Sequence, residues 1–425
     1  MNRVVITGLG VVSPNGIGIP NFLHAIKNGI SGIRKDPFLE KLNFQTTISG
    51  IPELDTIDID EYIDKISQRF LFSEAIKYGI IAAKDAWLDA GLPLPDKEDI
   101  DWDSGAIIGA GSIAMDNELI SQLYKIYDDK MVRKLGSKIT EQRMNNGPTV
   151  YVSGMLGLGN WVASNSSACS TGTESVIMGY NWIKDGKAKR MVCGSTEGQG
   201  PSSWAGFESM RILVRNSNDE PAKASRPLSA NASGFVPSTG GAVLILEDYE
   251  EAKRRGAHIY AEIIGGFANS GAQRMGGSMV APNSTGVQRC INTTIEMSGI
   301  QPTEIDLISG HLTGTMADPL EVANWKEVLN LKDSEFPYIN SLKSMIGHSL
   351  GAAGSIELVA CCLQMEHNFV HPSINSDPVH PRIKELIPEE KIPSNGAIET
   401  EINVIAKTSF AFGDTNSCII LKKVT

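Results

Sequence analysis

Residues 164–175 read SNSSACSTGTES, and residues 176–183 continue as VIMGYNWI. The first stretch places Cys169 among small polar side chains, whereas the second has apolar residues at helical spacing. This pattern predicts that Cys169 lies at the first turn of a buried helix. The free N–H groups and the dipole at a helix N-terminus would lower the pKa of a thiol there. A packed structural cysteine is the alternative, because most free cysteines are buried and inert.

The composition is typical of a globular chain with room for two domains. The 425 residues are 41% hydrophobic and 20% charged, and a chain of this length can bury a substantial core. The six cysteines form no paired metal motif, which favours reduced thiols. No apolar run approaches the ~20 residues that span a bilayer, and residues 1–10 do not resemble a secretory leader. We therefore expect a cytoplasmic protein without membrane insertion, and the net charge of −11 argues against nucleic acid as a partner.

Predicted strands alternate with predicted helices along the chain, which indicates an α/β fold built in layers. Strands are expected over residues 3–7, 103–111, 190–197, 242–247, 259–266, 305–308 and 402–407. Helices are expected over residues 70–91, 248–255, 286–298, 321–329 and 351–364. Both halves end on a strand that enters a glycine-bearing polar loop, which suggests internal duplication. We expect an N-terminal half over 1–255 and a C-terminal half over 256–425, with residues 119–146 as an insertion.

The strand over residues 3–7 leads into the sequence Gly8-Leu9-Gly10. A GxG after a strand can belong to a dinucleotide site. Here Ser13 stands where the next glycine of that fingerprint belongs, and Pro14 follows at once, so a helix cannot open comfortably. We therefore expect a glycine turn at this point.

Two of the seven histidines share a setting at the end of a predicted element, between glycine and hydroxyl residues. His311 lies in GHLTGT (310–315), and His348 lies in NSLKSMIGHSLGAAG (340–354). Each histidine alone could be structural. Together with Cys169 they suit chemistry in which an acyl group is held as a thioester and an oxyanion forms later. Zinc binding by the same three residues is the alternative.

Two charged residues accompany His348. Lys343 lies five residues before it, and could either face solvent or point inward and bias histidine protonation. Glu357 interrupts an otherwise apolar helix and needs a partner, for which Lys343 is the natural candidate. Asp318 and Glu321 are interpreted as ordinary helix-start residues.

The segment near the C-terminus reads SFAFGDTN (409–416). Its last four residues predict a tight loop whose backbone N–H groups could face the thiol. One of the phenylalanines could then gate a pocket. A plain turn beside core phenylalanines is the alternative.

These motifs resemble the β-ketoacyl-acyl carrier protein synthases of type I/II, which are condensing enzymes of the thiolase superfamily. The resemblance covers nearly the whole chain and rests on VVITGLGVVSPNG, SSACSTG, SRPLSA, HLTGT, KSMIGHSLGAAGSIE and SFAFGDTN. Two histidines with a lysine distinguish this type from the type III synthases and from the thiolases. The resemblance implies an α/β, thiolase-like, five-layered αβαβα fold made of two similar halves.

The same resemblance implies a decarboxylative Claisen condensation. Cys169 would take an acyl chain from acyl carrier protein, and malonyl-carrier protein would then lose CO₂. His311 and His348 would stabilise the enolate, with Lys343 and Glu357 completing the catalytic set. Attack on the Cys169 thioester would give a 3-ketoacyl-carrier protein.

The resemblance also assigns binding roles around this centre. The backbone N–H groups of Cys169 and Phe412 would form the oxyanion hole, and Phe412 would act as the gate. Thr313, Thr315 and Phe410 would contact the substrate, the two threonines through hydrogen bonds to the phosphopantetheine arm. No metal or other resident cofactor is implied, because the phosphopantetheine arrives on the carrier protein.

The partners implied are acyl carrier protein and a second chain, which would be a copy in a homodimer or a chain-length-factor-like paralogue in a heterodimer. Carrier proteins of this family are acidic, so a chain of net charge −11 would meet them through a local basic patch. The candidate docking residues are Arg69, Arg133, Lys134 and Arg226.

Several residues depart from the family pattern. Leu312 and Gly314 replace a glycine and a serine of the usual HGTST motif, and Met316 replaces the proline that follows it. Asp414 replaces a glycine of the usual GGTN loop, and Pro237 lies in a segment that usually carries an acid. We interpret these as signs of a specialised fatty-acid, polyketide or polyene synthase. The alternatives are a non-catalytic chain-length-factor partner and a thioester hydrolase that uses Cys169 with one histidine.

Overall fold

Two sets of five strands repeat the same order and the same directions. The computed structural model describes residues 1–111 and 117–424. The first set has the order β1-β8-β7-β5-β6 and the second the order β9-β15-β14-β10-β11. The strands of the first set are β1 (Val4–Ser13), β5 (Ser104–Ala110), β6 (Val162–Ala163), β7 (Arg190–Glu197) and β8 (Gly240–Asp248). Those of the second set are β9 (Ala261–Ser270), β10 (Leu307–Ser309), β11 (Tyr338–Asn340), β14 (Val404–Ala411) and β15 (Thr415–Lys422).

Strand directions repeat as well as strand order. The last three strands of each order run parallel to one another, namely β7, β5 and β6 in the first set and β14, β10 and β11 in the second. The remaining neighbours within each set are antiparallel. The two sets join where residues 4–6 of β1 pair with residues 261–263 of β9. This repeated topology fits the internal duplication suggested by the sequence. The boundary predicted after residue 255 falls between α10 (Tyr249–Arg254) and β9, and its position stays a prediction.

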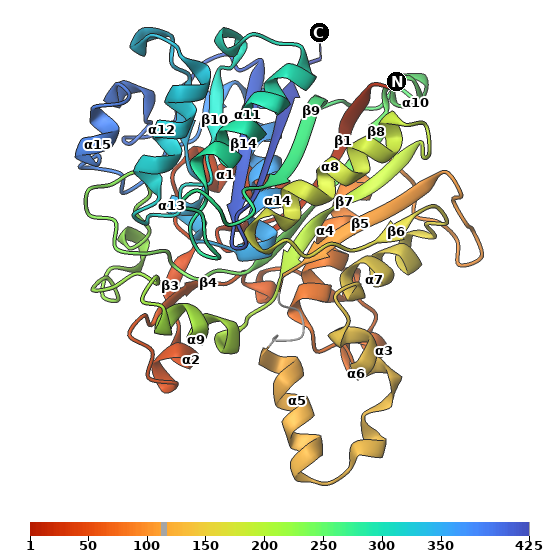
Figure 1. Cartoon of the computed structure of the whole chain (residues 1–425). Coiled ribbons are helices and arrows are strands. Elements are labelled where there is room, and N and C mark those ends of the chain that lie inside the picture. The colour runs from red at the N-terminus through yellow and green to blue at the C-terminus, as the bar shows by residue number, and fades with distance from the viewer. Residues whose placement is uncertain (112–116, 425) are drawn as a thin grey trace.

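Helices cover both strand sets on the outside and separate them on the inside (Figure 1). Two helices, α8 (Thr171–Lys184) and α14 (Ala353–His367), lie between the sets and contact strands of each. The outer helices are α4 (Glu74–Asp89) and α7 (Gly147–Leu156) on the first set, with α11 (Ser284–Ser298) and α12 (Asp318–Leu329) on the second. These are the five αβαβα layers that the family resemblance implied.

The glycine turn expected at Gly8-Leu9-Gly10 is wrong, because these residues lie inside β1. A Cβ at Gly8 would lie 2.2 Å from the backbone oxygen of Ala86, and one at Gly10 would lie 1.9 Å from that of Ala82. Both oxygens belong to α4, so the glycines let this helix pack closely on the strand. The reason for the glycines is thus a long-range contact.

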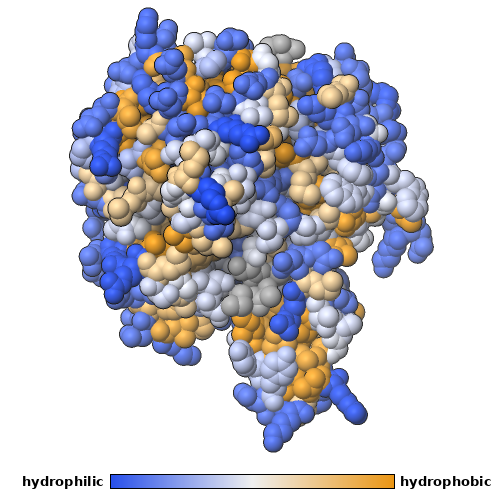
Figure 2. All heavy atoms as spheres, in the orientation of Figure 1, coloured by the Kyte–Doolittle hydropathy of each residue, from blue (hydrophilic) through white to orange (hydrophobic). Residues whose placement is uncertain are grey.

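The predicted helices over 286–298, 321–329 and 351–364 are confirmed as α11, α12 and α14, with ends shifted by a few residues. The segment interpreted as an insertion contains α5 (Asn117–Asp128) and α6 (Gly136–Arg143), which project from the body (Figure 1). Apolar side chains gather on this projection (Figure 2). Within the described ranges, no helix is long and apolar enough to cross a bilayer.

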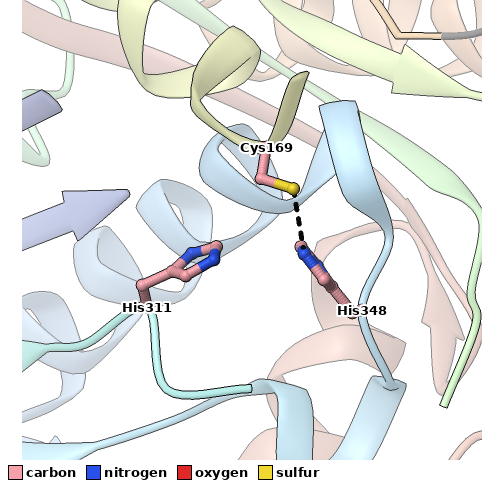
Figure 3. A group of neighbouring side chains, drawn as sticks. All are labelled: Cys169, His311 and His348. Atoms are coloured by element: carbon pink, nitrogen blue, oxygen red, sulfur yellow. Dashed lines mark hydrogen bonds between the residues drawn. The ribbon is translucent and has the colours of Figure 1, made fainter. Parts of the chain in front are cut away.

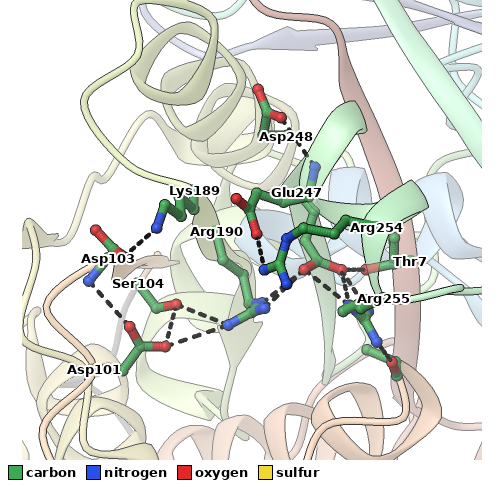
Figure 4. Close-up of polar contacts among 12 residues, drawn as sticks. Thr7, Asp101, Asp103, Ser104, Lys189, Arg190, Glu247, Asp248, Arg254 and Arg255 are labelled. Carbon is green, nitrogen blue, oxygen red and sulfur yellow. Dashed lines mark hydrogen bonds and ion pairs between the residues drawn. The ribbon is translucent and has the colours of Figure 1, made fainter.

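A buried ion-pair network fixes one end of the first strand set (Figure 4). Glu247 on β8 is fully buried, and its carboxylate pairs with Arg190 at 2.8 Å and with Arg255 at 2.5 Å. Thr7 Oγ1 donates a further hydrogen bond to Glu247 at 2.7 Å. The network ties β1, β7 and β8 together beside α10.

Candidate active site

Cys169 lies in a single 3-10 turn, η5 (Ala168–Ser170), directly before α8. The predicted position at the start of a buried helix is therefore confirmed to within one turn. Ala168 has a φ of 46°, a left-handed conformation that costs free energy in a non-glycine residue. Thr171 supports the turn, because its Oγ1 donates to Ala168 O at 2.7 Å and accepts from Ser167 N at 2.8 Å. A strained and well-supported turn of this kind holds its side chain in one direction.

His348 is held by a neighbouring strand-like segment. Its backbone N–H donates to Val236 O at 2.8 Å, and its carbonyl accepts from Ser238 N at 3.1 Å. The Phe235 ring packs edge-on against the imidazole at 5.2 Å between centroids. The side chain can therefore reach the cysteine without being free to swing.

His311 follows β10 and is placed by a buried carboxylate of α12. Glu321 accepts backbone hydrogen bonds from His311 N at 2.7 Å and from Leu312 N at 2.8 Å. Asp318 holds the next turn of the loop, accepting from Thr313 N at 2.9 Å and Gly314 N at 3.1 Å. The interpretation of these two acids as ordinary helix-start residues is incomplete. They do lie in the first turn of α12, but both are buried and bind the histidine loop.

The three side chains meet in space (Figure 3). His348 Nε2 lies 3.1 Å from Cys169 Sγ, and the two imidazole centroids are 5.3 Å apart. Each of the three residues offers one atom that could bind a metal, a sulfur or a ring nitrogen, and these three atoms all lie within 4.8 Å of one another. This is the only group of three or more His, Cys, Asp or Glu side chains close enough to hold a metal within the part of the chain that the structure describes. The geometry thus accommodates thioester chemistry and also the zinc alternative.

Burial sets the protonation states at this centre. It raises the pKa of the Cys169 thiol to about 12, although Lys343 acts in the opposite direction. The expected acidification of this thiol by the helix is therefore not found. Burial, followed by the charge of Lys343, lowers the pKa of both His311 and His348 well below the ordinary value. The resting centre therefore contains a neutral thiol and two neutral imidazoles, and the His348 ring can accept the thiol proton.

Lys343 and Glu357 form the buried ion pair expected from the sequence. Both side chains are about 1% exposed. Burial lowers the pKa of Lys343, whereas Glu357 acts to raise it. A second lysine, Lys407 on β14, was missed by the sequence analysis. Its Nζ lies 2.8 Å from the other carboxylate oxygen of Glu357, and the only sequence signal was a lysine inside the apolar run VIAKTSFA.

A cavity of about 910 Å³ opens beside the three side chains. Its lining includes Cys169, His311 and His348 together with Phe410, Phe412, Thr313 and Thr315. The two threonine hydroxyls lie 3.0 Å apart, and the Phe412 ring packs edge-on against Phe207 at 6.0 Å. The residues assigned to substrate contact therefore line one space. Their roles, and the oxyanion hole at Phe412, stay predictions.

None of the four candidate docking residues lines this cavity. Arg69, Arg133 and Lys134 are exposed, and Arg226 is half-buried with its Nε donating to Lys223 O at 2.8 Å. Arg211, which the sequence analysis did not single out, does line the cavity.

Asp414 contacts a loop that does not carry the thiol. Its carboxylate accepts from Gln273 N and Asn283 N, both at 2.9 Å. Gly413 N also donates to Met279 O at 2.8 Å. Asp414 therefore fastens residues 271–283 to the SFAFGDTN segment. This loop reaches the cavity, since Val280 is part of the lining.

Leu312 also has a structural place. Its side chain is buried and lines the cavity. Its Cδ1 lies 2.6 Å from where a Cβ on Gly310 would be, so Leu312 folds back over a glycine that leaves it room.

Comparison with known proteins gives a consistent result over the whole chain. The model of the "Beta-ketoacyl synthase, N-terminal domain" matches residues 1–252, and that of the "Beta-ketoacyl synthase, C-terminal domain" matches residues 260–377. The chain is 33% identical to 3-oxoacyl-[acyl-carrier-protein] synthase 1 of Escherichia coli strain K12, with all of both chains covered.

Solved structures agree with the sequence matches. A beta-ketoacyl synthase from Burkholderia phymatum is similar at a TM-score of 0.89 and 27% identity, with both chains fully covered. A type II PKS ketosynthase in complex with its acyl-carrier protein is similar at a TM-score of 0.85 and 29% identity, again with full coverage of both chains.

Proposed function

The chain belongs to the β-ketoacyl synthase family, and on that premise we propose that it condenses an acyl group on Cys169 with malonyl-acyl carrier protein. The products are a 3-ketoacyl-carrier protein and CO₂, in a fatty-acid or in a polyketide or polyene pathway. One observation carries the proposal. A half-buried thiol in contact with a neutral imidazole, with a second neutral imidazole beside it, faces a cavity of about 910 Å³.

The first step loads the acyl group. His348 Nε2, at 3.1 Å, accepts the proton of the Cys169 thiol as the sulfur attacks the carbonyl carbon of the acyl thioester. The C–S bond to the phosphopantetheine thiol breaks, and the proton passes to that leaving sulfur. The imidazole and the phosphopantetheine thiol are both neutral after this step, and the acyl chain is on Cys169.

The second step releases CO₂ from malonyl-carrier protein. The bond between the malonyl carboxylate and its α-carbon breaks, and its electron pair moves into the enolate of the remaining thioester. Each neutral imidazole has one N–H, which His311 and His348 are proposed to donate to the enolate oxygen. His348 therefore has to hold its proton on Nδ1 during loading and on Nε2 during decarboxylation. Rings that stay neutral near physiological pH suit this work.

The third step forms the new carbon–carbon bond. The enolate carbon attacks the carbonyl carbon of the Cys169 thioester, and the negative charge develops on its oxygen. The backbone N–H groups of Cys169 and Phe412 are proposed to bind this oxyanion. Its collapse expels the Cys169 sulfur, which regains a proton from solvent, and the 3-ketoacyl product stays on the carrier.

Thr313 and Thr315 are proposed to hydrogen-bond the phosphopantetheine arm, and Phe410 to contact the same ligand. Phe412 is proposed to gate the acyl pocket, because its ring lies against Phe207 on the cavity wall. The phosphopantetheine is supplied by the carrier protein, so the proposed cycle uses no group bound permanently to this chain.

For carrier docking, a basic residue at the cavity supports an acidic partner. Arg211 lines the cavity and is exposed, so we place it beside Arg69, Arg133, Lys134 and Arg226 as a docking candidate. Charge reversal of Arg211 should weaken carrier binding and make the residual binding less dependent on salt.

The projecting helices are proposed to pack on a second copy of this chain. Met131 is 40% exposed, Val132 58% and Met144 50%, and exposed apolar side chains gathered on one projection mark an interaction surface (Figure 2). Light scattering during size exclusion should show a dimer, and Val132→Glu should weaken it. A monomer that dimerises only with a paralogous chain would instead support the heterodimer.

A reconstituted reaction tests the function. The protein is mixed with acyl-carrier protein and malonyl-carrier protein, and 3-ketoacyl-carrier protein and CO₂ are measured over a panel of chain lengths. We expect product with the wild-type chain and none with Cys169→Ala. Free acid without ketoacyl product would support a thioester hydrolase, and activity that appears only after a second ketosynthase is added would support the chain-length-factor role.

A further inference from the structure

Lys407 is a fully buried lysine that the mechanism above does not use. It lies on β14, with its Nζ 2.8 Å from Glu357 Oε2. The other oxygen of that carboxylate pairs with Lys343. Two buried lysines therefore share one acid, and a positive charge in a protein interior without its own counter-charge lowers stability. Such an arrangement calls for a role beyond packing.

The position of Lys407 in the strand directs it to the middle layer. Side chains alternate along a strand, so Lys407 and Ser409 point to one face of β14. Lys407 Nζ donates to Ser409 Oγ at 3.1 Å, and Ser409 Oγ lies 2.9 Å from Thr173 Oγ1 at the start of α8. Ser170 Oγ also donates to the backbone oxygen of Ser409 at 3.1 Å. Lys407 is thus connected to the helix that follows Cys169.

Thr408 lies between Lys407 and Ser409 and points to the opposite face of β14, toward the loop that carries His311. Thr408 Oγ1 lies 3.4 Å from Glu321 Oε1 and donates to it, and Glu321 holds the backbone of His311. Three consecutive residues of β14 thus have three different contacts. Lys407 binds the carboxylate that pairs with Lys343, Thr408 binds the acid that holds His311, and Ser409 binds the helix that follows Cys169.

We propose that Lys407 is a positioning residue for the condensation. The inference rests on the proposed function. Lys407 fixes Glu357 from the side opposite to Lys343, and its positive charge acts with that of Lys343 to keep the imidazoles of His311 and His348 neutral, each with an N–H to offer the enolate oxygen.

The charged and titratable groups around the two imidazoles come from every neighbouring element. They are Cys169 from η5, Glu197 from β7, Arg211 after α9 (Pro201–Ser209), Asp318 and Glu321 from α12, Lys343 from α13 (Lys343–Ile346), Glu357 from α14 and Lys407 from β14. Burial is the largest cause of the lowered pKa of both imidazoles, Lys343 is next, and Lys407 acts in the same direction on each. Removal of Lys407 leaves the Lys343–Glu357 pair electrically balanced and should let the rings protonate more readily.

The test compares wild-type protein with Lys407→Met, Lys407→Arg and Ser409→Ala. Ring nitrogens of labelled histidine are titrated by NMR, and the pH profile of malonyl decarboxylation is measured in parallel. Lys407→Met should raise the pKa of both imidazoles, and should move the acid limb of the rate to higher pH by the same amount. Lys407→Arg and Ser409→Ala both keep the charge, so neither should shift the histidine titration.

A folded Lys407→Met protein with wild-type histidine titration would overturn the proposal, and a lowered melting temperature alone would mark a structural lysine. Should Lys407→Met fail to fold, Lys407→Gln, which also removes the charge, is titrated in its place. The wild-type titration supplies a second check. Rings of His311 and His348 that are half-protonated at pH 6.5, as an ordinary histidine is, would contradict the inference. The titration needs no substrate. A wild-type chain that forms no acyl adduct would therefore refute the proposed function without being mistaken for failure of this inference.

Discussion

Nε2 of His348 lies 3.1 Å from Sγ of Cys169, although 179 residues separate the two in the chain. Because burial raises the pKa of the thiol and lowers that of the imidazole, the pair is neutral at rest. The proton moves when the acyl thioester arrives. Cys169 is then a nucleophile activated by its base on attack, unlike a preformed thiolate.

The first prediction concerns the pH dependence of thiol alkylation. Well below a thiol pKa of about 12, the thiolate fraction grows tenfold with each pH unit. Alkylation of Cys169 by iodoacetamide should therefore accelerate steadily through the alkaline range, as followed by intact mass with Cys169→Ser as background. A rate that levels off near neutral pH would reveal an acidic thiol. A chelator should leave the alkylation rate unchanged. If Cys169 bound a zinc ion, the chelator would remove the ion and alkylation would become faster.

The second prediction concerns the two histidines. Replacing His311 or His348 by alanine removes one hydrogen-bond donor from the enolate oxygen, and the loss of one such donor typically costs about 10²–10³ in rate. CO₂ release from malonyl-carrier protein should fall by this factor in each variant. His24→Ala on α1 (Ile19–Lys27), which is exposed, serves as the matched histidine control. Undiminished CO₂ release in both site variants would contradict the two-histidine mechanism.

The third prediction concerns Asp414. Asp414→Asn places an amide N–H₂ against one of two backbone N–H groups, at Gln273 or Asn283, and an unsatisfied buried donor costs about 1–3 kcal/mol. Residues 271–283 should then exchange their amide hydrogens faster, as read by mass spectrometry. Acyl loading of Cys169 should persist, because the Asp414 carboxylate faces the loop. Unaltered exchange in that loop would show that Asp414 does not fasten it.

The fourth prediction concerns stability. Burial raises the pKa of Glu247, but Arg255, Arg190 and Thr7 act more strongly together and lower it overall. A carboxylate with a lowered folded-state pKa stabilises the fold above its unfolded-state pKa and loses that effect as the pH falls through the folded-state value. Glu247→Gln should cost about 3 kcal/mol in urea unfolding at neutral pH, and less as the pH falls below 4.5.

The matched control for this change is Glu399→Gln, whose carboxylate forms an exposed ion pair with Lys27 at 2.9 Å. An exposed pair contributes less than about 1 kcal/mol. Equal losses in the two variants would mean that the Glu247 network adds nothing beyond a surface contact.

Local patterns in the sequence predicted much of this molecule. Cys169, His311 and His348 each stand in a motif that can be recognised from its immediate neighbours. These neighbours are small residues at the ends of predicted helices or strands. The pairing of Lys343 with Glu357 followed from the cost of a charge on an apolar helix. In each of these cases the signal lies within one short segment of the chain.

What the sequence did not predict depends on distant contacts. Gly8 and Gly10 imitate a turn, although α4 is what demands their missing side chains. Lys407 looks like the polar end of a strand until α14 brings Glu357 to it. The acid Glu321 looks like a helix-start residue until the histidine loop folds back onto it.

The most direct test of the central claim is the mass of the protein after incubation with an acyl-carrier protein alone. The account predicts an increase equal to one acyl group, located on Cys169 by peptide mapping and released as ketoacyl product when malonyl-carrier protein is added. A folded wild-type chain whose mass stays unchanged across the panel of acyl chains would contradict the proposed function.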